Sequence, residues 1–111
     1  MRSVRINQTV YIVNYYRVAG AFYVDYFPNF VYKTTVEMKN KTHFITPEIF
    51  DNCKIDSVRR SFNIEYDYGD LWFTSLKDVK DVLKKTGYKL EKTSSDNYWN
   101  VVGVKHGKQD N

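Results

Sequence analysis

The sequence predicts a single α+β domain over residues 1–111, in which a mainly antiparallel, twisted sheet carries one short and one longer helix packed on one face. Three observations lead to this fold class. Most segments alternate apolar and polar residues with the period of a β-strand, and one segment repeats its apolar residues with the period of a helix. Only two prolines and five glycines interrupt the chain, and its hydrophobic content of 42% is that of a globular protein.

The N-terminal part is expected to form an antiparallel meander of strands rich in β-branched and aromatic residues. Gly20 marks the first turn, and the pair Pro28-Asn29 has the composition of a second turn. A third turn is expected at residues 39–42, which read "KNKT". The predicted strands are 4–18, 21–27, 30–38 and a short one at 43–45.

Helix signals then interrupt the strands. Thr46 can cap a helix, Pro47 suits its first turn, and Glu48 suits the positive end of its dipole. Together they predict a short helix over 47–53. Strand periodicity returns after this helix, with a tight turn at 67–70. The predicted strands of this part are 57–66, 71–73, 88–92 and 98–104, followed by a loose tail over 105–111.

The clearest helix signal of the sequence lies between residues 75 and 87. Ser75 and Asp78 pair in the manner of a capping box at its start, and Gly87 provides a stop signal at its end. One stripe of apolar residues runs along the segment and predicts the face that packs on the sheet. The stripe consists of Leu76, Val79, Val82 and Leu83.

Three lysines lie opposite this stripe at positions i, i+3 and i+7, namely Lys77, Lys80 and Lys84. They are candidates for contacts to phosphate groups, since a lysine that binds a nucleic-acid backbone releases a condensed counterion. The alternative is an ordinary solvated helix face, because Asp78 and Asp81 stand among the lysines at salt-bridging spacings. The net charge of +4 and the pI near 9.1 permit nucleic-acid or acidic partners and require neither.

Aromatic residues are concentrated near the N-terminus, where nine of them lie between Tyr11 and Tyr32. Two helices are too few to cover both faces of the expected sheet, so several rings should lie on its solvated face. A group of exposed rings is typical of an interaction surface. The alternative is ordinary packing of rings across neighbouring strands. The expected partner-binding residues are Tyr11, Tyr15, Arg17, Tyr23, Phe27 and Lys33.

The sequence shows no catalytic constellation, no glycine-rich phosphate loop and no metal-binding motif, so we expect no enzyme, no cofactor and no metal. The single cysteine, Cys53, is expected to be a small buried hydrophobe in a reducing compartment. No apolar segment has the character of a signal peptide or the length of a membrane span. These observations predict a cytoplasmic protein with no membrane partner.

We therefore expect a small binding protein whose partner is another protein or a nucleoprotein complex. The abundance of Lys, Asn, Tyr and Ile is typical of accessory proteins of phages and mobile elements, many of which inhibit a host enzyme or defence system in the host cytoplasm. A second hypothesis is nucleic-acid binding through a tyrosine-rich sheet face and the lysine-rich helix. A third is a structural subunit that oligomerises through a sheet edge.

Overall fold

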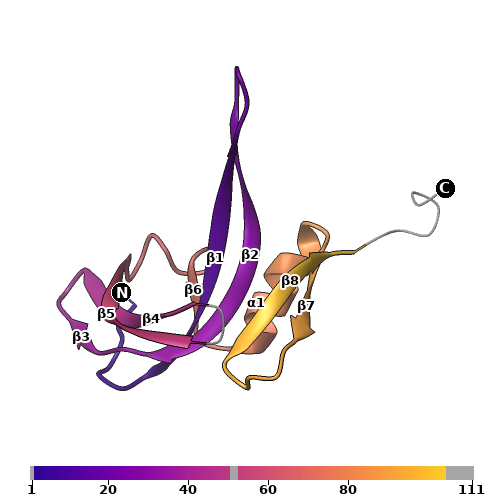
Figure 1. Cartoon of the computed structure of the whole chain (residues 1–111). Helices are drawn as coiled ribbons and strands as arrows, with labels where there is room; N and C mark the ends of the chain where they lie inside the picture. The colour runs from indigo at the N-terminus through magenta and orange to yellow at the C-terminus, as the bar shows by residue number, and fades with distance from the viewer. Residues whose placement is uncertain (1, 51–52, 105–111) are drawn as a thin grey trace.

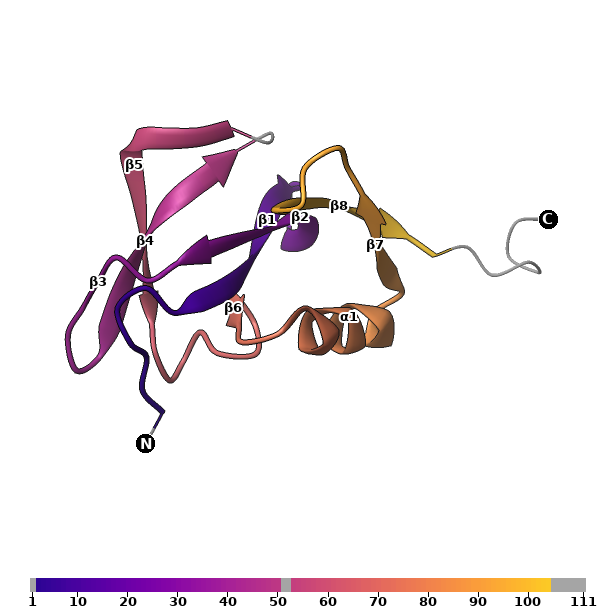
Figure 2. The ribbon, with the colours of Figure 1, turned by 90° about the horizontal axis from the view of Figure 1, so that it is seen from below.

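The computed structural model of the chain describes residues 2–50 and 53–104 and arranges them in two antiparallel sheets and one helix (Figures 1 and 2). The larger sheet has five strands in the order β6-β1-β2-β8-β7, and the smaller sheet has three in the order β3-β4-β5. This architecture confirms the predicted α+β class and the mainly antiparallel pairing. The elements are β1 (Thr9–Ala19), β2 (Val24–Thr35), β3 (Met38–Lys39), β4 (His43–Phe50), β5 (Cys53–Asn63), β6 (Trp72–Phe73), α1 (Leu76–Lys85), β7 (Tyr88–Lys92) and β8 (Tyr98–Gly103).

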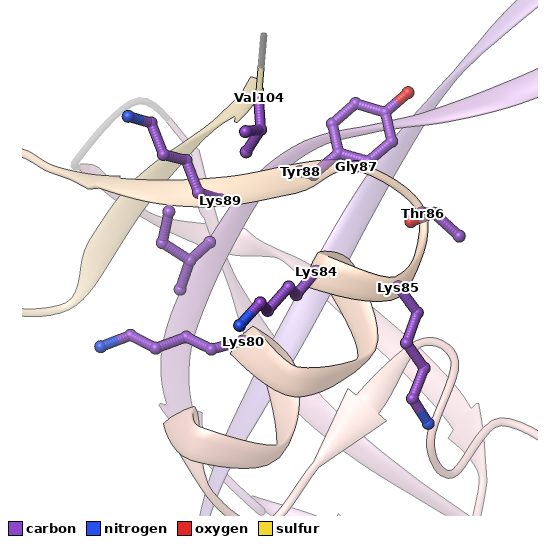
Figure 3. Close-up of a pocket in the computed structure, with 9 residues that line it drawn as sticks. Lys80, Lys84, Lys85, Thr86, Gly87, Tyr88, Lys89 and Val104 are labelled. Carbon is purple, nitrogen blue, oxygen red and sulfur yellow. The ribbon is translucent and has the colours of Figure 1, made fainter. Parts of the chain in front are cut away.

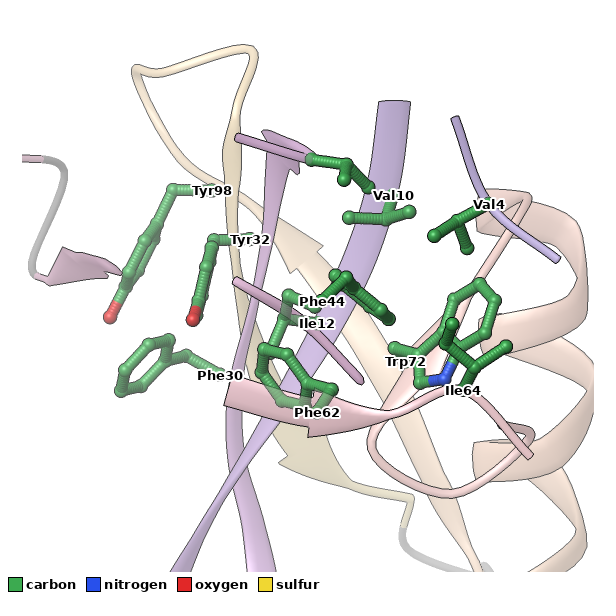
Figure 4. Packing of buried hydrophobic residues seen from close by; sticks show 11 residues of the cluster. Val4, Val10, Ile12, Phe30, Tyr32, Phe44, Phe62, Ile64, Trp72 and Tyr98 are labelled. Carbon is green, nitrogen blue, oxygen red and sulfur yellow. The ribbon is translucent and has the colours of Figure 1, made fainter. Parts of the chain in front are cut away.

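Two hydrophobic clusters cover opposite faces of the β1–β2 pair near residues 10–13 and 30–32, which we call its lower part. The first cluster combines residues of both sheets, such as Ile12 and Tyr32 from the larger sheet and Phe44 and Phe62 from the smaller (Figure 4). The second cluster joins the larger sheet to α1, and it includes Val13, Val31, Phe73, Val79, Leu83 and Trp99. The strand pair is therefore enclosed between a second sheet on one face and a helix on the other.

The helix α1 confirms the prediction for residues 75–87. The Oγ atom of Ser75 accepts a hydrogen bond from the backbone N–H of Asp78 at 3.2 Å, which caps the first turn. Val79 and Leu83 from the predicted stripe are buried against the sheet. Gly87 follows the helix with φ at +90°, a backbone conformation that glycine adopts without steric cost. Strands β7 and β8 also lie where the sequence predicts them.

The short helix predicted over 47–53 is wrong. Residues 47–50 belong to β4 and Cys53 begins β5, while residues 51–52 lie outside the described part of the chain. The two strands pair antiparallel, with a shift of register between Pro47 and Glu48 that lets the chain accommodate the proline. Backbone pairing with β5 therefore overrides the local helix signals, and α1 is the only helix among the described residues.

The turn predicted at Pro28-Asn29 is also wrong, because both residues lie inside the single strand β2. Asn14 pairs with Phe30 and Tyr15 pairs with Pro28, which leaves Asn29 as an extra residue in a β-bulge. A proline is tolerated at such a position because the bulge already interrupts the ladder of backbone hydrogen bonds. The two strands predicted over 21–27 and 30–38 thus form one long strand that pairs with β1.

Smaller corrections concern the ends of the predicted strands. β1 begins at Thr9, not at residue 4, because Asn7 adopts a positive φ of 69° in a turn. β2 ends at Thr35, after which Met38 and Lys39 form β3 in the smaller sheet. The side chain of Cys53 and the predicted loose tail over 105–111 lie outside the described part of the structure.

Candidate functional site

The candidate site is the outer part of the β1–β2 hairpin, residues 15–28, which we call the arm. Pairing in the arm runs from Tyr15 opposite Pro28 to Ala19 opposite Val24, and residues 20–23 form the turn. At about 3.4 Å per residue, the paired residues carry this turn roughly 17 Å beyond the bulge. Figure 1 shows the outer end of the arm rising alone above the other described elements.

The side chains at the outer end of the arm are large, apolar and exposed. Phe22 is 99% exposed, and Tyr23 and Tyr26 are 61% and 60% exposed. Side chains of this kind, gathered on one projection, are uncommon on a protein surface that has no binding role. The other exposed large apolar side chains of the arm are Tyr16, Val18 and Val24.

Apolar groups occupy both faces of the arm. Tyr16 lies opposite Phe27 on one face, with 5.7 Å between the ring centroids. Arg17 lies opposite Tyr26 on the other face, because successive residues of a strand point to opposite sides. Asp25 is the second charged residue of the arm, so the formal charges of its two ionic side chains cancel. The arm is therefore a ring-bearing ribbon with no net charge.

Gly20 opens the turn of the arm. Its backbone N–H donates a hydrogen bond to the carbonyl oxygen of Tyr23 at 2.9 Å, which closes the turn. A Cβ atom at residue 20 would collide with the ring of Tyr23, which folds back over the glycine. The absence of a side chain at this position thus leaves room for the ring of Tyr23.

Tyr15 ties the foot of the arm to the loop before β6. Its hydroxyl donates to the carboxylate Oδ1 of Asp70 at 3.3 Å, and the carbonyl oxygen of Asp70 lies at 3.4 Å. Burial is the main cause that raises the pKa of Tyr15 to about 12, and the negative charge and the hydrogen bond of Asp70 contribute to the same rise. A hollow of about 360 Å³ lies here, and it is lined by Tyr15, Tyr26, Arg60, Asp70 and Leu71.

The structure divides the predicted partner-binding residues between two regions. Tyr11 and Lys33 pair with each other below the bulge, where Tyr11 is half-buried with its ring centroid 6.1 Å from that of Trp99. The remaining predicted residues lie on the arm, where Arg17 and Tyr23 are exposed and the other two are half-buried. The four are Tyr15, Arg17, Tyr23 and Phe27.

Sequence reasoning missed Phe22, Tyr26 and Tyr16, which are among the most exposed rings of the arm. The cause is the turn predicted at Pro28-Asn29, which lies at the bulge inside β2. Because the prediction ended a strand there, it gave no indication that the β1–β2 hairpin is so long. A signal was present in the four residues "GAFY" at 20–23, which separate two apolar runs of similar length and begin with glycine.

Four lysines gather in a second region, which we call the lysine groove (Figure 3). It lies between the end of α1 and β7, with a volume of about 710 Å³. Lys80 and Lys84 from the predicted phosphate-binding set line it, whereas Lys77 is absent from its lining and forms an ion pair with Asp81 at 2.8 Å. The other lining residues are Lys85, Thr86, Gly87, Tyr88, Lys89, Leu90 and Val104.

Comparison with known proteins gives no match to a protein-family model, a curated protein or a solved structure. The described residues include no group of three or more His, Cys, Asp or Glu side chains placed to hold a metal ion. Within the same ranges, no helix has the length and apolar character needed to cross a bilayer.

Proposed function

We propose that this chain is a small, non-enzymatic binding protein whose arm engages a macromolecular partner, either a protein or a nucleoprotein complex. The observation that carries the proposal is the near-complete exposure of Phe22, together with exposed Tyr23 and Tyr26, at the end of a projecting ribbon. Tyrosine and other aromatic residues dominate the energetically important centres of protein interfaces. A ribbon of this kind with no net charge suits a partner surface with an apolar cleft.

The backbone of the arm supports the same proposal. β1 pairs with β6 only at Tyr11 and Ile12, and β2 pairs with β8 only at residues 30–32. Both outer edges of the arm therefore lack a neighbouring strand among the described residues. A two-stranded ribbon is marginally stable alone in water. A partner can stabilise it by adding a strand to one edge or by covering its rings.

A projecting arm with no net charge also suits insertion into a functional cleft of the partner, which would block that cleft. We therefore propose inhibition of the partner as the consequence of binding. The composition expected of a phage or mobile-element accessory protein agrees with a host enzyme or defence system as the target. Inhibition of the purified partner, once it is identified, tests this extension separately from binding.

The hypothesis of one nucleic-acid surface made of tyrosines and Lys77, Lys80 and Lys84 has weaker support. Such a surface needs exposed rings beside unpaired lysines. Tyr11 and Tyr15 are half-buried beside α1, and Lys77 pairs with Asp81. The exposed rings lie instead on the outer arm, which carries no net charge.

The proposal is tested by placing a photo-crosslinking phenylalanine analogue at position 22 and, as a matched control, at position 66. Tyr66 is 87% exposed and lies outside the arm. We expect a crosslinked partner from position 22 and none from position 66 in extracts of the native host. Mass spectrometry then identifies the partner, which is purified for a quantitative measurement.

Calorimetry with the purified partner compares the native chain with Phe22→Ser and with the control Tyr66→Ser. Removal of a central aromatic anchor typically costs about 2 kcal/mol or more, which corresponds to a roughly 30-fold weaker affinity. We expect this loss for Phe22→Ser alone. Equal affinities of the native chain and Phe22→Ser for every crosslinked protein would contradict the proposal.

A further inference from the structure

The lysine groove has a distinct chemical character that the arm does not share. Figure 3 shows Lys80 and Lys84 rising from the helix and Lys89 extending from β7, with their ammonium groups on the same side of the groove. Leu90 and Val104 contribute apolar side chains to the lining. Among the described residues, the lining contains no acidic side chain and no arginine.

No ion pair within the described residues includes Lys80, Lys84, Lys85 or Lys89. The nearest acid on the helix, Asp81, is bound by Lys77, and the hydrogen bond from Lys77 is the main cause that lowers the pKa of Asp81. Asp81 lies near enough to Lys84 and Lys85 for their charges to help lower its pKa, but its ion pair is with Lys77. The lysines of the groove are thus available to an external anion.

Helix stability accounts for only part of this arrangement. Lys84 and Lys85 lie in the last turn of α1, where positive side chains offset the negative end of the helix dipole. Lys80 lies one turn earlier and Lys89 lies on a different element, so neither is explained by the dipole. The helix dipole therefore does not explain why lysines from a helix and a strand line one groove together with apolar residues.

We propose that the lysine groove binds a short segment of single-stranded nucleic acid. Ammonium groups act as point charges that suit phosphate oxygens, whereas planar, two-pronged recognition of carboxylates favours arginine, which the described lining lacks. The apolar lining residues Leu90 and Val104 and the ring of Tyr88 offer surface on which a base can pack. A groove of about 710 Å³ is in the size range of small-ligand sites, so about one or two nucleotides of the strand fill it.

The inference is independent of the proposed function of the arm, since the two regions share no lining residue. Its test is fluorescence anisotropy with a labelled oligothymidine at several salt concentrations. The groove variant combines Lys84→Gln with Lys89→Gln, and the matched control combines Lys41→Gln with Lys92→Gln, which removes the same charge outside the groove and leaves the Lys77–Asp81 pair intact. Circular dichroism establishes that each variant is folded.

We expect the native chain to bind the oligonucleotide at low salt and the groove variant to bind about tenfold more weakly. The slope of log affinity against log salt should become shallower by about 1.4, the value for two lost phosphate contacts to a single strand. The control should keep most of the native affinity, and Phe22→Ser should keep it as well.

Three results would overturn the inference. The first is no binding of the oligonucleotide by the native chain at low salt. The second is an equal loss of affinity in the groove variant and the control, which would show a response to net charge alone. The third is binding of a polyglutamate peptide in place of the oligonucleotide, which would assign the groove to an acidic protein segment.

Discussion

The two halves of the β1–β2 ribbon have similar sequences and opposite environments. Below the bulge, Ile12 and Tyr32 are fully buried, whereas above it Phe22 is almost fully exposed. Both halves are rich in aromatic and β-branched residues, and both pair in the same antiparallel manner. The difference lies in the layers that surround them, since the lower half is covered by the smaller sheet and by α1. The composition of the two halves therefore favours strands in both, and tertiary packing determines which aromatic rings are buried in the core.

Aromatic side chains contribute more to stability in the lower half of the ribbon than at the outer end of the arm. An aromatic ring buries roughly 150–250 Å² when it is covered, which at about 25 cal/mol per Å² stabilises the fold by roughly 4–6 kcal/mol before entropy is counted. Rings on the outer arm keep most of that area in water. Their burial free energy remains available for association with a partner.

The largest effect is expected from Trp72→Ala in β6, the strand that pairs with the covered half of the ribbon at Ile12. The indole is fully buried, its ring centroid lies 5.0 Å from that of Phe44 and 4.7 Å from that of Tyr68, and its N–H donates to the carbonyl oxygen of Asn63 at 3.2 Å. Truncation should lower the free energy of unfolding by about 3–5 kcal/mol. Urea denaturation followed by circular dichroism measures this loss, and a loss below about 1 kcal/mol would contradict the packing described here.

Sequence reasoning recovered the elements whose signals are local and missed those set by distant pairing. The helix α1 was predictable because Ser75, its apolar stripe and Gly87 lie within the segment itself. The signals at Pro47 and at Pro28 were equally local, but pairing with the other strand of each hairpin, β5 and β1, overrode them. A bulge that absorbs a proline leaves no sequence pattern that differs from a turn.

The candidate site was predictable only as a region. Four of its predicted members lie on the arm, yet the exposure of Phe22 depends on how far β1 and β2 extend beyond the layers that cover them. For the groove, the helix period placed Lys80 and Lys84 on one face, but Lys89 joins them only through the packing of β7 beside α1. Such contacts between elements are not encoded in the spacing of residues along one element.

A second, smaller effect is expected at alkaline pH, from two tyrosines of the ribbon. The pKa of Tyr15 and the pKa of Tyr32 are both raised from 10.0 to about 12, mainly by burial. For Tyr32, the positive charge of Arg60 opposes the shift and the negative charge of Glu48 adds to it. Each group holds its proton in the folded state after the unfolded chain has lost it, so the free energy of unfolding should fall as pH rises from 10 to 12.

Denaturation at a series of pH values measures this fall, and the absorbance of tyrosinate follows the ionisation directly. The variants Tyr15→Phe and Tyr32→Phe should each make the fall less steep, because each removes one group that takes part in it. An exposed-ring control, Tyr66→Phe, tests whether any tyrosine has this effect. A native chain whose stability is constant between pH 10 and 12 would show that the two hydroxyls are more hydrated than their surroundings imply.

The smallest effect on stability is expected from Phe22→Ser at the tip of the arm. Because this ring is 99% exposed, its removal takes away almost no buried contact, and the free energy of unfolding should change by less than about 0.5 kcal/mol. Urea denaturation of the isolated chain measures it beside Trp72→Ala. A large loss of stability would mean that the arm folds against something in the isolated protein, such as a second copy of the chain, and the comparison between the two halves would fail. An unchanged stability combined with a lost partner shows instead that the outer rings serve binding alone, since a residue that contributes nothing to folding has no structural role to lose.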